Sequence, residues 1–274
     1  MKTSKWDARI ERARMLERQY PFAAEGLLFY AHIANFQRSL YSEIEKTGFS
    51  SNSSLQGELD LTFLLPRFSE FLSLIRQIAP ESLSKTAREL QEKGVEGWKQ
   101  TLADFWHGAA VSPAATGSTG DESAGTPERS LPWIFLQPYA EFLAERSKPV
   151  ISDGTPSSCP LCGCKPIAGV LRSEGDGAKK SLICMLCAHE WAFRRLYCPS
   201  CGEEREPQMA FYSAPEIAHV RVDVCDTCHT YLKTIDLTKT GLADPVVDEL
   251  ATVPLDLWAR EHGYEKLQIN LLGI

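Results

Sequence analysis

Hydrophobic residues recur at helical spacing through the first half of the chain. Residues 5–19 are charge-rich and lack glycine and proline, and residues 22–46 place large apolar side chains three or four positions apart. This spacing gathers the apolar side chains on one face of a helix. Further segments with the same pattern follow at 66–79, from Pro80 to Gly94, at 95–106 and at 131–146. We therefore predict an all-helical domain, a bundle of about four to six helices, over residues 1–150.

Prolines and a change of composition divide this helical region. Pro66 and Pro80 stand where helices are expected to begin, because the missing N–H costs nothing there and the fixed φ angle suits the first turn. Residues 108–130 consist mainly of glycine, alanine, serine, threonine and proline. Such a segment cannot bury enough apolar surface to order itself, so we predict a long flexible loop.

The second half of the chain shows shorter apolar runs that are typical of strands. The candidate strands are 167–171 and 180–184, then 208–212 and 218–224, and each pair should form a hairpin. The segment 188–196 between the pairs is rich in large side chains, and we expect it to pack the two hairpins against each other. A last helix is predicted over 246–262, with an interruption at Pro254.

Cysteines give this half its most specific pattern. Residues 1–158 contain none, and four Cys-x-x-Cys pairs follow. Two such pairs about 20 residues apart can supply the four sulfurs of one tetrahedral metal site, each pair from a tight turn. The predicted ligands are Cys159, Cys162, Cys184 and Cys187 at site 1, and Cys198, Cys201, Cys225 and Cys228 at site 2.

The first turn of each site has the same wording, Cys-Pro-x-Cys-Gly, which indicates an internal duplication. Gly163 and Gly202 follow the second cysteine of these turns and can adopt a positive φ, which directs backbone N–H groups toward the sulfurs. The second turns, after Cys187 and Cys228, lack that glycine, so we expect them to be less regular.

Other interpretations of the cysteines fit less well. A disulfide framework suits a small secreted domain, whereas the N-terminus has no apolar signal segment. A thioredoxin-like redox pair would not need four pairs. Cys164 is the one unpaired cysteine and is expected to be a bystander, while His189, His219 and His229 are expected beside the sites or at the surface. Tetrahedral sulfur suits zinc and iron alike, and zinc is the structural default.

The predicted fold class is therefore α+β. An N-terminal helical bundle precedes two tandem metal-binding modules, which resemble rubredoxin or zinc ribbons, and a C-terminal helix. The predicted segments are the helical domain 1–150, the modules 151–196 and 197–240, and the C-terminal helix and tail 241–274.

Composition and charge narrow the function. The chain has 274 residues and a mass of 30.5 kDa, with a net charge of -7 and a pI near 5.5. An acidic chain does not favour a nucleic-acid or anionic-membrane partner, and no segment is apolar enough for membrane insertion. We expect a cytoplasmic protein, because a reducing compartment suits metal-bound thiolates. The sequence contains no P-loop, no GxGxxG after a strand and no nucleophile elbow, so we do not expect an enzyme.

Four segments together point to one family. They are Cys-Pro-Leu-Cys-Gly at 159–163, Cys-Met-Leu-Cys-Ala-His-Glu-Trp at 184–191 with Arg195 and Cys198 following, Cys-Asp-Thr-Cys-His-Thr-Tyr-Leu-Lys at 225–233, and Asp-Glu-Leu-Ala at 248–251. With them the chain resembles the formate dehydrogenase accessory proteins of the FdhE type, over about residues 155–262. The resemblance implies a cytoplasmic maturation factor for respiratory formate dehydrogenase that associates with its catalytic subunit. The likeness of the turns to rubredoxin favours iron over zinc.

Two hypotheses of function follow. In the first, two bound metal ions hold the modules rigid as an adaptor for the formate dehydrogenase catalytic subunit. Aromatic and cationic side chains, which are enriched at protein interfaces, are the candidate contacts: Trp191, Arg194, Arg195, Tyr231 and Lys233. In the second, the chain is a rubredoxin-like one-electron redox protein that acts on a client during assembly. A nucleic-acid-binding ribbon is disfavoured by the acidic pI.

Overall fold

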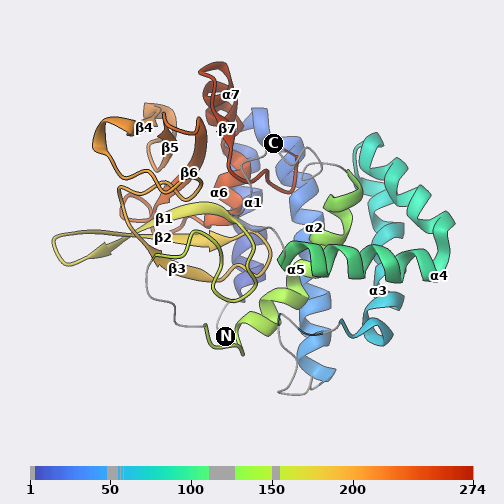
Figure 1. Ribbon diagram of the computed structural model, residues 1–274. Coiled ribbons are helices and arrows are strands. Elements are labelled where there is room, and N and C mark those ends of the chain that lie inside the picture. Colours follow the sequence, from blue (N-terminus) through green and yellow to red (C-terminus); the bar gives the residue numbers. More distant parts are fainter. Residues whose placement is uncertain are drawn as a thin grey trace.

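The computed structural model describes residues 4–47, 55, 57, 59–110, 127–149 and 155–273. Helices occupy one side of the molecule and a sheet the other (Figure 1). The helical side is formed by α1 (Lys5–Gln19), the 3-10 turn η1 (Pro21–Ala23), α2 (Ala24–Thr47), α3 (Leu61–Ile78), α4 (Glu81–Ala110) and α5 (Pro127–Ala144). The predicted helical N-terminal region and the α+β class are confirmed.

Helix α3 begins earlier than predicted. Its N-cap is Asp60, whose carboxylate accepts a hydrogen bond of 3.1 Å from the amide N–H of Phe63. The helix therefore starts at Leu61, and Pro66 lies inside it rather than at its first position. A proline here removes a single helical hydrogen bond near the first turn. The capping carboxylate is thus a stronger start signal than the proline.

Helix α4 is interrupted at Gly94, and α4 and α5 border the predicted loop. Gly94 has φ 64° and ψ -170°, so α4 consists of two helical pieces, as its sequence predicts. Within the predicted loop 108–130, residues 111–126 lie outside the described residues. The flanks of that loop are helical, because α4 continues to Ala110 and α5 already begins at Pro127, where a proline suits the first turn.

The sheet has seven strands and includes both predicted hairpins. Neighbouring strands follow the order β3-β2-β1-β6-β5-β4, and β7 lies beside β6. Their bounds are β1 (Pro166–Glu174), β2 (Gly177–Cys184), β3 (Glu190–Phe193), β4 (Met209–Ser213), β5 (Val220–Cys225), β6 (Thr230–Asp236) and β7 (Glu265–Lys266). The antiparallel pairs β1–β2 and β4–β5 are the predicted hairpins. Strands β3, β6 and β7 were not predicted.

The sheet shows the internal duplication as two three-stranded halves. Strands β1, β2 and β3 repeat in β4, β5 and β6, and the halves join through the parallel pair β1–β6. A Cβ atom at Gly169 would lie 2.3 Å from Thr234 Oγ1, so this junction requires glycine. The expectation that 188–196 joins the hairpins was wrong, since β3 lies at the outer edge of the sheet.

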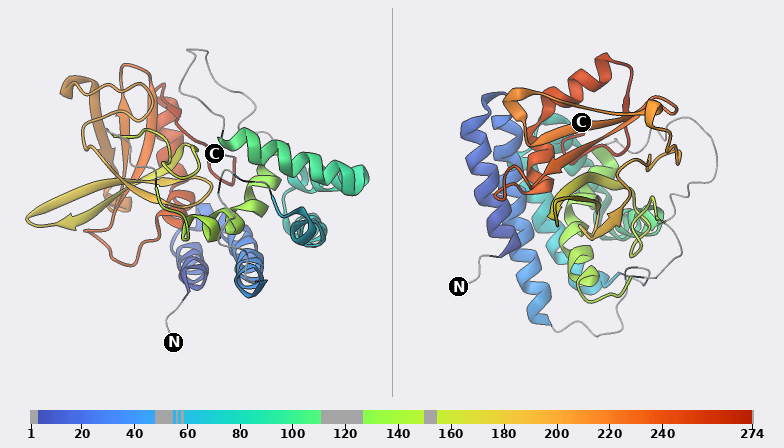
Figure 2. Two further views of the ribbon diagram at one scale, coloured as in Figure 1. Left: turned by 60° about the horizontal axis from the view of Figure 1, so that its bottom comes forward. Right: turned by 90° about the vertical axis from the view of Figure 1, so that its left-hand side faces the viewer.

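Two C-terminal helices connect the sheet to the helical side. They are α6 (Pro245–Ala251) and α7 (Val253–Glu261), and the break between them falls at Thr252, with Pro254 in the first turn of α7. Helix α6 contacts α1 and α2 as well as β1 and β6. Figure 2 shows it between the sheet and the long N-terminal helices. Both halves of the molecule therefore share this contact.

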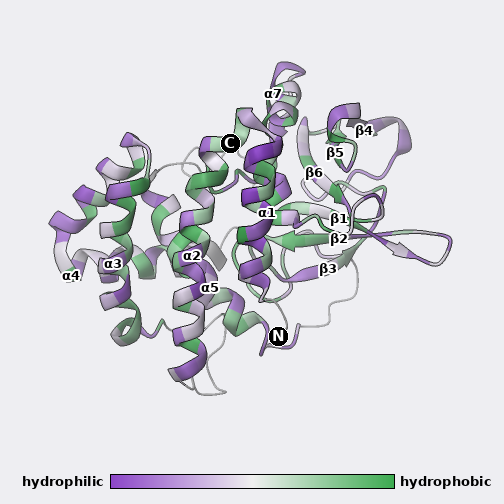
Figure 3. Cartoon of the chain, turned by 180° about the vertical axis from the view of Figure 1, so that it is seen from behind, coloured by the Kyte–Doolittle hydropathy of each residue, from purple (hydrophilic) through white to green (hydrophobic). Residues whose placement is uncertain are grey.

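Buried charges lie at this contact and within the helical side. Helix α1 is largely hydrophilic (Figure 3), yet Arg9 and Arg12 are buried. Arg9 pairs with Glu141 of α5 at 2.7 Å, and Arg12 Nε donates to Asp248 of α6 at 2.9 Å. Burial acts to raise the pKa of Asp248, but hydrogen bonds from His219 and Arg12 outweigh it and hold that pKa below its usual value. Asp248 is therefore a carboxylate that links α1, α6 and the sheet.

The predicted domain boundary near residue 150 coincides with 150–154, which lie outside the described residues. The division into four segments stays a prediction. No helix in the described ranges is both long and apolar enough to cross a membrane.

Candidate metal centres

Site 1 is assembled from two turns at the same end of the β1–β2 hairpin. Cys159 and Cys162 precede β1, while Cys184 ends β2 and Cys187 follows it. The four sulfur atoms lie within 4.8 Å of one another, and all four residues are buried. The sulfur of Cys162 lies 3.2 Å from that of Cys184 and 3.6 Å from that of Cys187. The fold therefore brings together the four cysteines predicted for this site.

Site 2 repeats this arrangement at the β4–β5 hairpin. Cys198 and Cys201 precede β4, Cys225 ends β5, and all four sulfurs again lie within 4.8 Å. The sulfur distances are 3.7 Å for Cys198–Cys228 and 3.7 Å for Cys201–Cys225. Cys201 is exposed and Cys228 is half-buried. Site 2 is thus open to solvent on one side, whereas site 1 is enclosed.

The glycine of each first turn has the predicted positive φ, although its own N–H donates to a carbonyl and not to a sulfur. Gly163 and Gly202 both have φ 76°, the left-handed conformation that glycine adopts most readily. The amide N–H of Gly163 donates to the Cys159 carbonyl at 2.9 Å, and that of Gly202 donates to the Cys198 carbonyl at 3.0 Å. These bonds close each turn around its two sulfurs.

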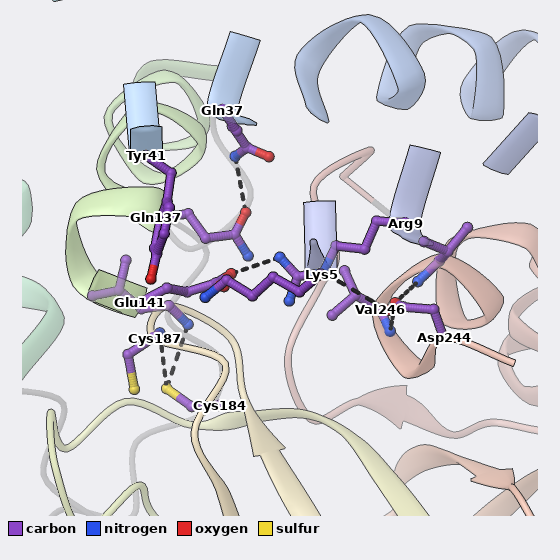
Figure 4. Close-up of polar contacts among 12 residues, drawn as sticks. Lys5, Arg9, Gln37, Tyr41, Gln137, Glu141, Cys184, Cys187, Asp244 and Val246 are labelled. Atoms are coloured by element: carbon purple, nitrogen blue, oxygen red, sulfur yellow. Dashed lines mark hydrogen bonds and ion pairs between the residues drawn. The ribbon is translucent and has the colours of Figure 1, made fainter. Parts of the chain in front are cut away.

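The second turns are more regular than predicted. Ala188 and His229 occupy the equivalent positions with φ 51° and 52°, so both turns adopt the left-handed conformation without a glycine. At site 1 the amide N–H groups of Leu186 and Cys187 point to the Cys184 sulfur at 3.4 and 3.5 Å (Figure 4). The flanking strands and these bonds impose the turn, although the conformation is costly for a residue with a Cβ.

The sulfur geometry fits a tetrahedral metal ion. With metal–sulfur bonds of about 2.3 Å, tetrahedral sulfurs lie about 3.8 Å apart. The distances of 3.6 to 3.7 Å approach that value, and even the 3.2 Å between Cys162 and Cys184 far exceeds a disulfide bond. Burial raises the pKa of the Cys184 thiol well above its usual range, because apolar surroundings disfavour a thiolate. A bound cation reverses that preference.

Cys164 lies beside the four sulfurs of site 1 and its thiol interacts with those of Cys162 and Cys184, but it is not one of the four grouped cysteines. It is 2% exposed, and its carbonyl accepts a 2.9 Å hydrogen bond from the Cys159 amide. Four sulfurs already complete a tetrahedron without it. His189, His219 and His229 also lie outside both sulfur groups, and His219 instead contacts Asp248 at 2.7 Å.

Site 1 also contacts the helical half of the molecule. The indole N–H of Trp133 on α5 donates to the carbonyl of Met185, inside the second turn, at 3.0 Å. Gln137 of α5 lines one small cavity together with Trp133 and Met185. The conformation of the second turn of site 1 and the position of α5 are therefore linked.

The predicted contact residues divide into buried and exposed ones. Trp191, Tyr231 and Lys233 are only 6%, 1% and 0% exposed, and their polar atoms bind other parts of the chain. A buried side chain has no surface to offer to a partner, so these three are withdrawn as contacts. Arg194 and Arg195 are exposed, and Arg194 pairs with Glu204 at 2.6 Å.

Sequence reasoning missed the ion cluster around Lys233. Lys233 and Lys266 from the sheet meet Glu249 and Asp256 from α6 and α7, and all four side chains are at most 2% exposed. Tyr231 donates a hydrogen bond to Asp256 at 2.9 Å. Glu249 and Asp256 fall within the predicted last helix, but no strand was predicted at Lys233 or Lys266, so no pattern in the sequence pairs these four charges.

Comparisons with known proteins indicate one family for this chain. The family models "FdhE, central domain" and "FdhE, C-terminal domain" match residues 158–195 and 196–272. A protein FdhE homolog from Shewanella baltica (strain OS223) is 30% identical over 82% of this chain and 69% of its own length. One from Aquifex aeolicus (strain VF5) is 26% identical over 96% of this chain and 94% of its own.

A solved structure has the same fold. The crystal structure of the FdhE protein from Pseudomonas aeruginosa superposes with a TM-score of 0.66, at 22% identity, over 97% of this chain and 94% of that one. The sequence matches and the two four-cysteine groups lead to one conclusion. The chain belongs to the FdhE family of formate dehydrogenase accessory proteins.

Proposed function

We propose that this chain is a maturation factor that binds the catalytic subunit of formate dehydrogenase through a rigid, metal-held adaptor, and that it acts in the cytoplasm. The observation that carries the proposal is the pair of four-cysteine groups in a member of this accessory family. An ion at each group would fix two turns and one hairpin. The sheet would then offer a rigid, preformed surface to a partner. Arg194 and Arg195 are the exposed residues retained as contacts.

We propose a non-catalytic role for the metal ions. The eight predicted ligands are Cys159, Cys162, Cys184 and Cys187, with Cys198, Cys201, Cys225 and Cys228. Four thiolates fill a tetrahedral shell, and a filled shell offers no position to water or substrate. The ions would then supply structure, and the chain's own residues would supply recognition.

A capture experiment tests the adaptor role. Tagged protein should retain the formate dehydrogenase catalytic subunit from a reducing extract, and the double variant Cys184→Ser/Cys187→Ser should lose it, because site 1 would no longer be closed. Cys164→Ser is the matched control, since this thiol lies outside the sulfur set, and it should capture the subunit normally. Equal capture by all three proteins would refute the adaptor proposal.

A one-electron redox role is the second candidate, and the exposure of Cys201 favours it. Electrons can reach a metal ion more easily where a ligand contacts solvent, and tetrathiolate iron of the rubredoxin type is redox-active. Protein purified without air should then contain about two iron ions per chain, show visible sulfur-to-iron bands and lose these bands when dithionite is added. A colourless zinc protein that still captures the client would exclude this role and leave the adaptor role intact.

A further inference from the structure

We propose that the outer edge of β4 binds an extended, cationic segment of a partner polypeptide, which adds a strand to the sheet. The inference deepens the proposed function, on which it rests for the identity of the partner. Strand β4 is the last strand of the sheet on one side (Figure 1), so within the described residues its outer edge has no neighbour. An edge of this kind can pair with another chain through its backbone.

Backbone geometry identifies the groups that would bind. The amide N–H of Asp226 donates to the Gln208 carbonyl at 2.9 Å, so Gln208 directs its backbone toward β5. Directions alternate along an antiparallel strand. Phe211 and Ser213 therefore direct their N–H and C=O groups away from β5, toward the outer side. The Met209 carbonyl points the same way, but the Met209 N–H already donates to the Glu206 carbonyl.

The duplicated half of the same sheet shows how an edge equivalent to that of β4 can be covered. In the first half, β1 occupies the place that β4 has in the second half, and the outer edge of β1 is covered by β6. The same kind of edge is thus filled by an extended strand in one half and open in the other. This contrast favours a strand, rather than a helix, as the occupant of β4.

Side chains along β4 also favour a partner. Phe211 is 62% exposed and Tyr212 is 45% exposed, which is unusual for aromatic residues on a sheet. Tyr212 packs on Trp258 of α7 with ring centroids 4.6 Å apart, and Arg221 lies over Phe211 at 4.7 Å. The strand therefore presents fixed aromatic surfaces, one on each face, beside an open backbone edge.

Charge selects a cationic segment. Residues 196–272 contain 13 acidic and 6 basic residues, a difference of -7 that equals the net charge of the whole chain. Glu206 and Glu216 flank the two ends of β4 and are exposed, whereas the neighbouring Arg205 and Arg221 are already paired with Glu203 and Asp223. A second copy of this acidic region would be repelled, and a basic segment would be attracted.

A labelled peptide of about six alternating arginine and valine residues, the usual length of a strand, tests the site on the full-length, metal-loaded protein. We expect fluorescence anisotropy to show binding that weakens as salt is added. Amide hydrogen exchange should slow at Phe211 and Ser213. The same peptide with glutamate in place of arginine should bind at least about tenfold more weakly.

Two substitutions at one position separate backbone pairing from side-chain contact. Phe211→Pro removes an N–H that points away from β5, so the sheet should stay intact while the edge loses one of its two outward donors. Phe211→Thr removes the ring and keeps the N–H. We expect the proline variant to lose about tenfold or more in affinity and the threonine variant to lose less, with unchanged metal content and circular dichroism in both.

Several results would overturn the assignment. Equal binding of the proline and threonine variants, equal binding of the two peptides, or slowed exchange only outside β4 would each do so. Self-association that the peptide displaces would assign the edge to a second copy instead. If Phe211→Pro captures the formate dehydrogenase catalytic subunit as wild type does, the docking site fails and the maturation role stands. Peptide binding without any capture of the subunit would instead support the docking site and refute the maturation role.

Discussion

Replacing Cys162 by serine should unfold much of the molecule, whereas replacing Cys201 by serine should disturb only the region around site 2. Each change removes one ligand and should lower the metal content by one ion. The expected difference arises from position, because site 1 is enclosed and its second turn accepts the hydrogen bond from Trp133 of α5. A structural ion contributes about 10 to 16 kcal/mol in small metal domains, comparable to or more than the usual stability of about 5 to 15 kcal/mol.

Three measurements check this difference. Near-ultraviolet circular dichroism and urea unfolding should show that Cys162→Ser has lost its cooperative transition, and hydrogen exchange in α5 should become fast. Cys201→Ser should retain a cooperative transition, because site 2 is bordered by exposed turns and receives no hydrogen bond from the N-terminal helices among the described contacts. Cys164→Ser serves as the control for loss of a buried thiol. Equal effects of the two ligand variants would show that site 1 does not hold the halves together.

The two four-cysteine groups could be predicted because their signal is local. Each Cys-x-x-Cys turn places two sulfurs by itself, and the repeated spacing indicates which turns belong together, so all eight cysteines were assigned to the correct group. The helices were predictable for the same reason, because a hydrophobic period of 3.6 residues can be recognised within one segment of the sequence. The residues at which helices begin were harder to predict. Helix α3, for example, begins after the capping carboxylate of Asp60 and not at Pro66.

The junction of the two halves could not be predicted, because it depends on residues far apart in the chain. The parallel pair β1–β6 joins Gly169 to Thr234. Neither residue type indicates in the sequence which strand it will pair with. The left-handed turn at Ala188 is likewise imposed by its neighbours rather than by its own preference. Lys233 looked like a surface cation suited to a partner, since its counter-charges follow later in the chain and only the folded α6 and α7 bring them close.

That cluster leads to the second large effect: Lys233→Met should destabilise the protein by about 3 to 5 kcal/mol. The Nζ atom of Lys233 lies 2.6 Å from Asp256 Oδ2 and 3.0 Å from Glu249 Oε1, in surroundings that exclude solvent. Burial is the main reason that the pKa of Lys233 is lowered, and the carboxylates act against this shift. Without this cation, Lys266 alone faces two buried carboxylates, and one negative charge is left without compensation.

Urea unfolding of four variants, namely Lys233→Met, Asp256→Asn, their double variant and Lys99→Met, separates charge from packing. Lys99→Met removes a cation from an exposed pair with Glu96 and should have almost no effect, because exposed pairs contribute little. The double variant Lys233→Met/Asp256→Asn restores neutrality and should recover part of the stability that Lys233→Met loses. If the double variant is as unstable as the sum of its two single changes, the loss comes from packing, and the charges of this cluster do not hold α7 to the sheet.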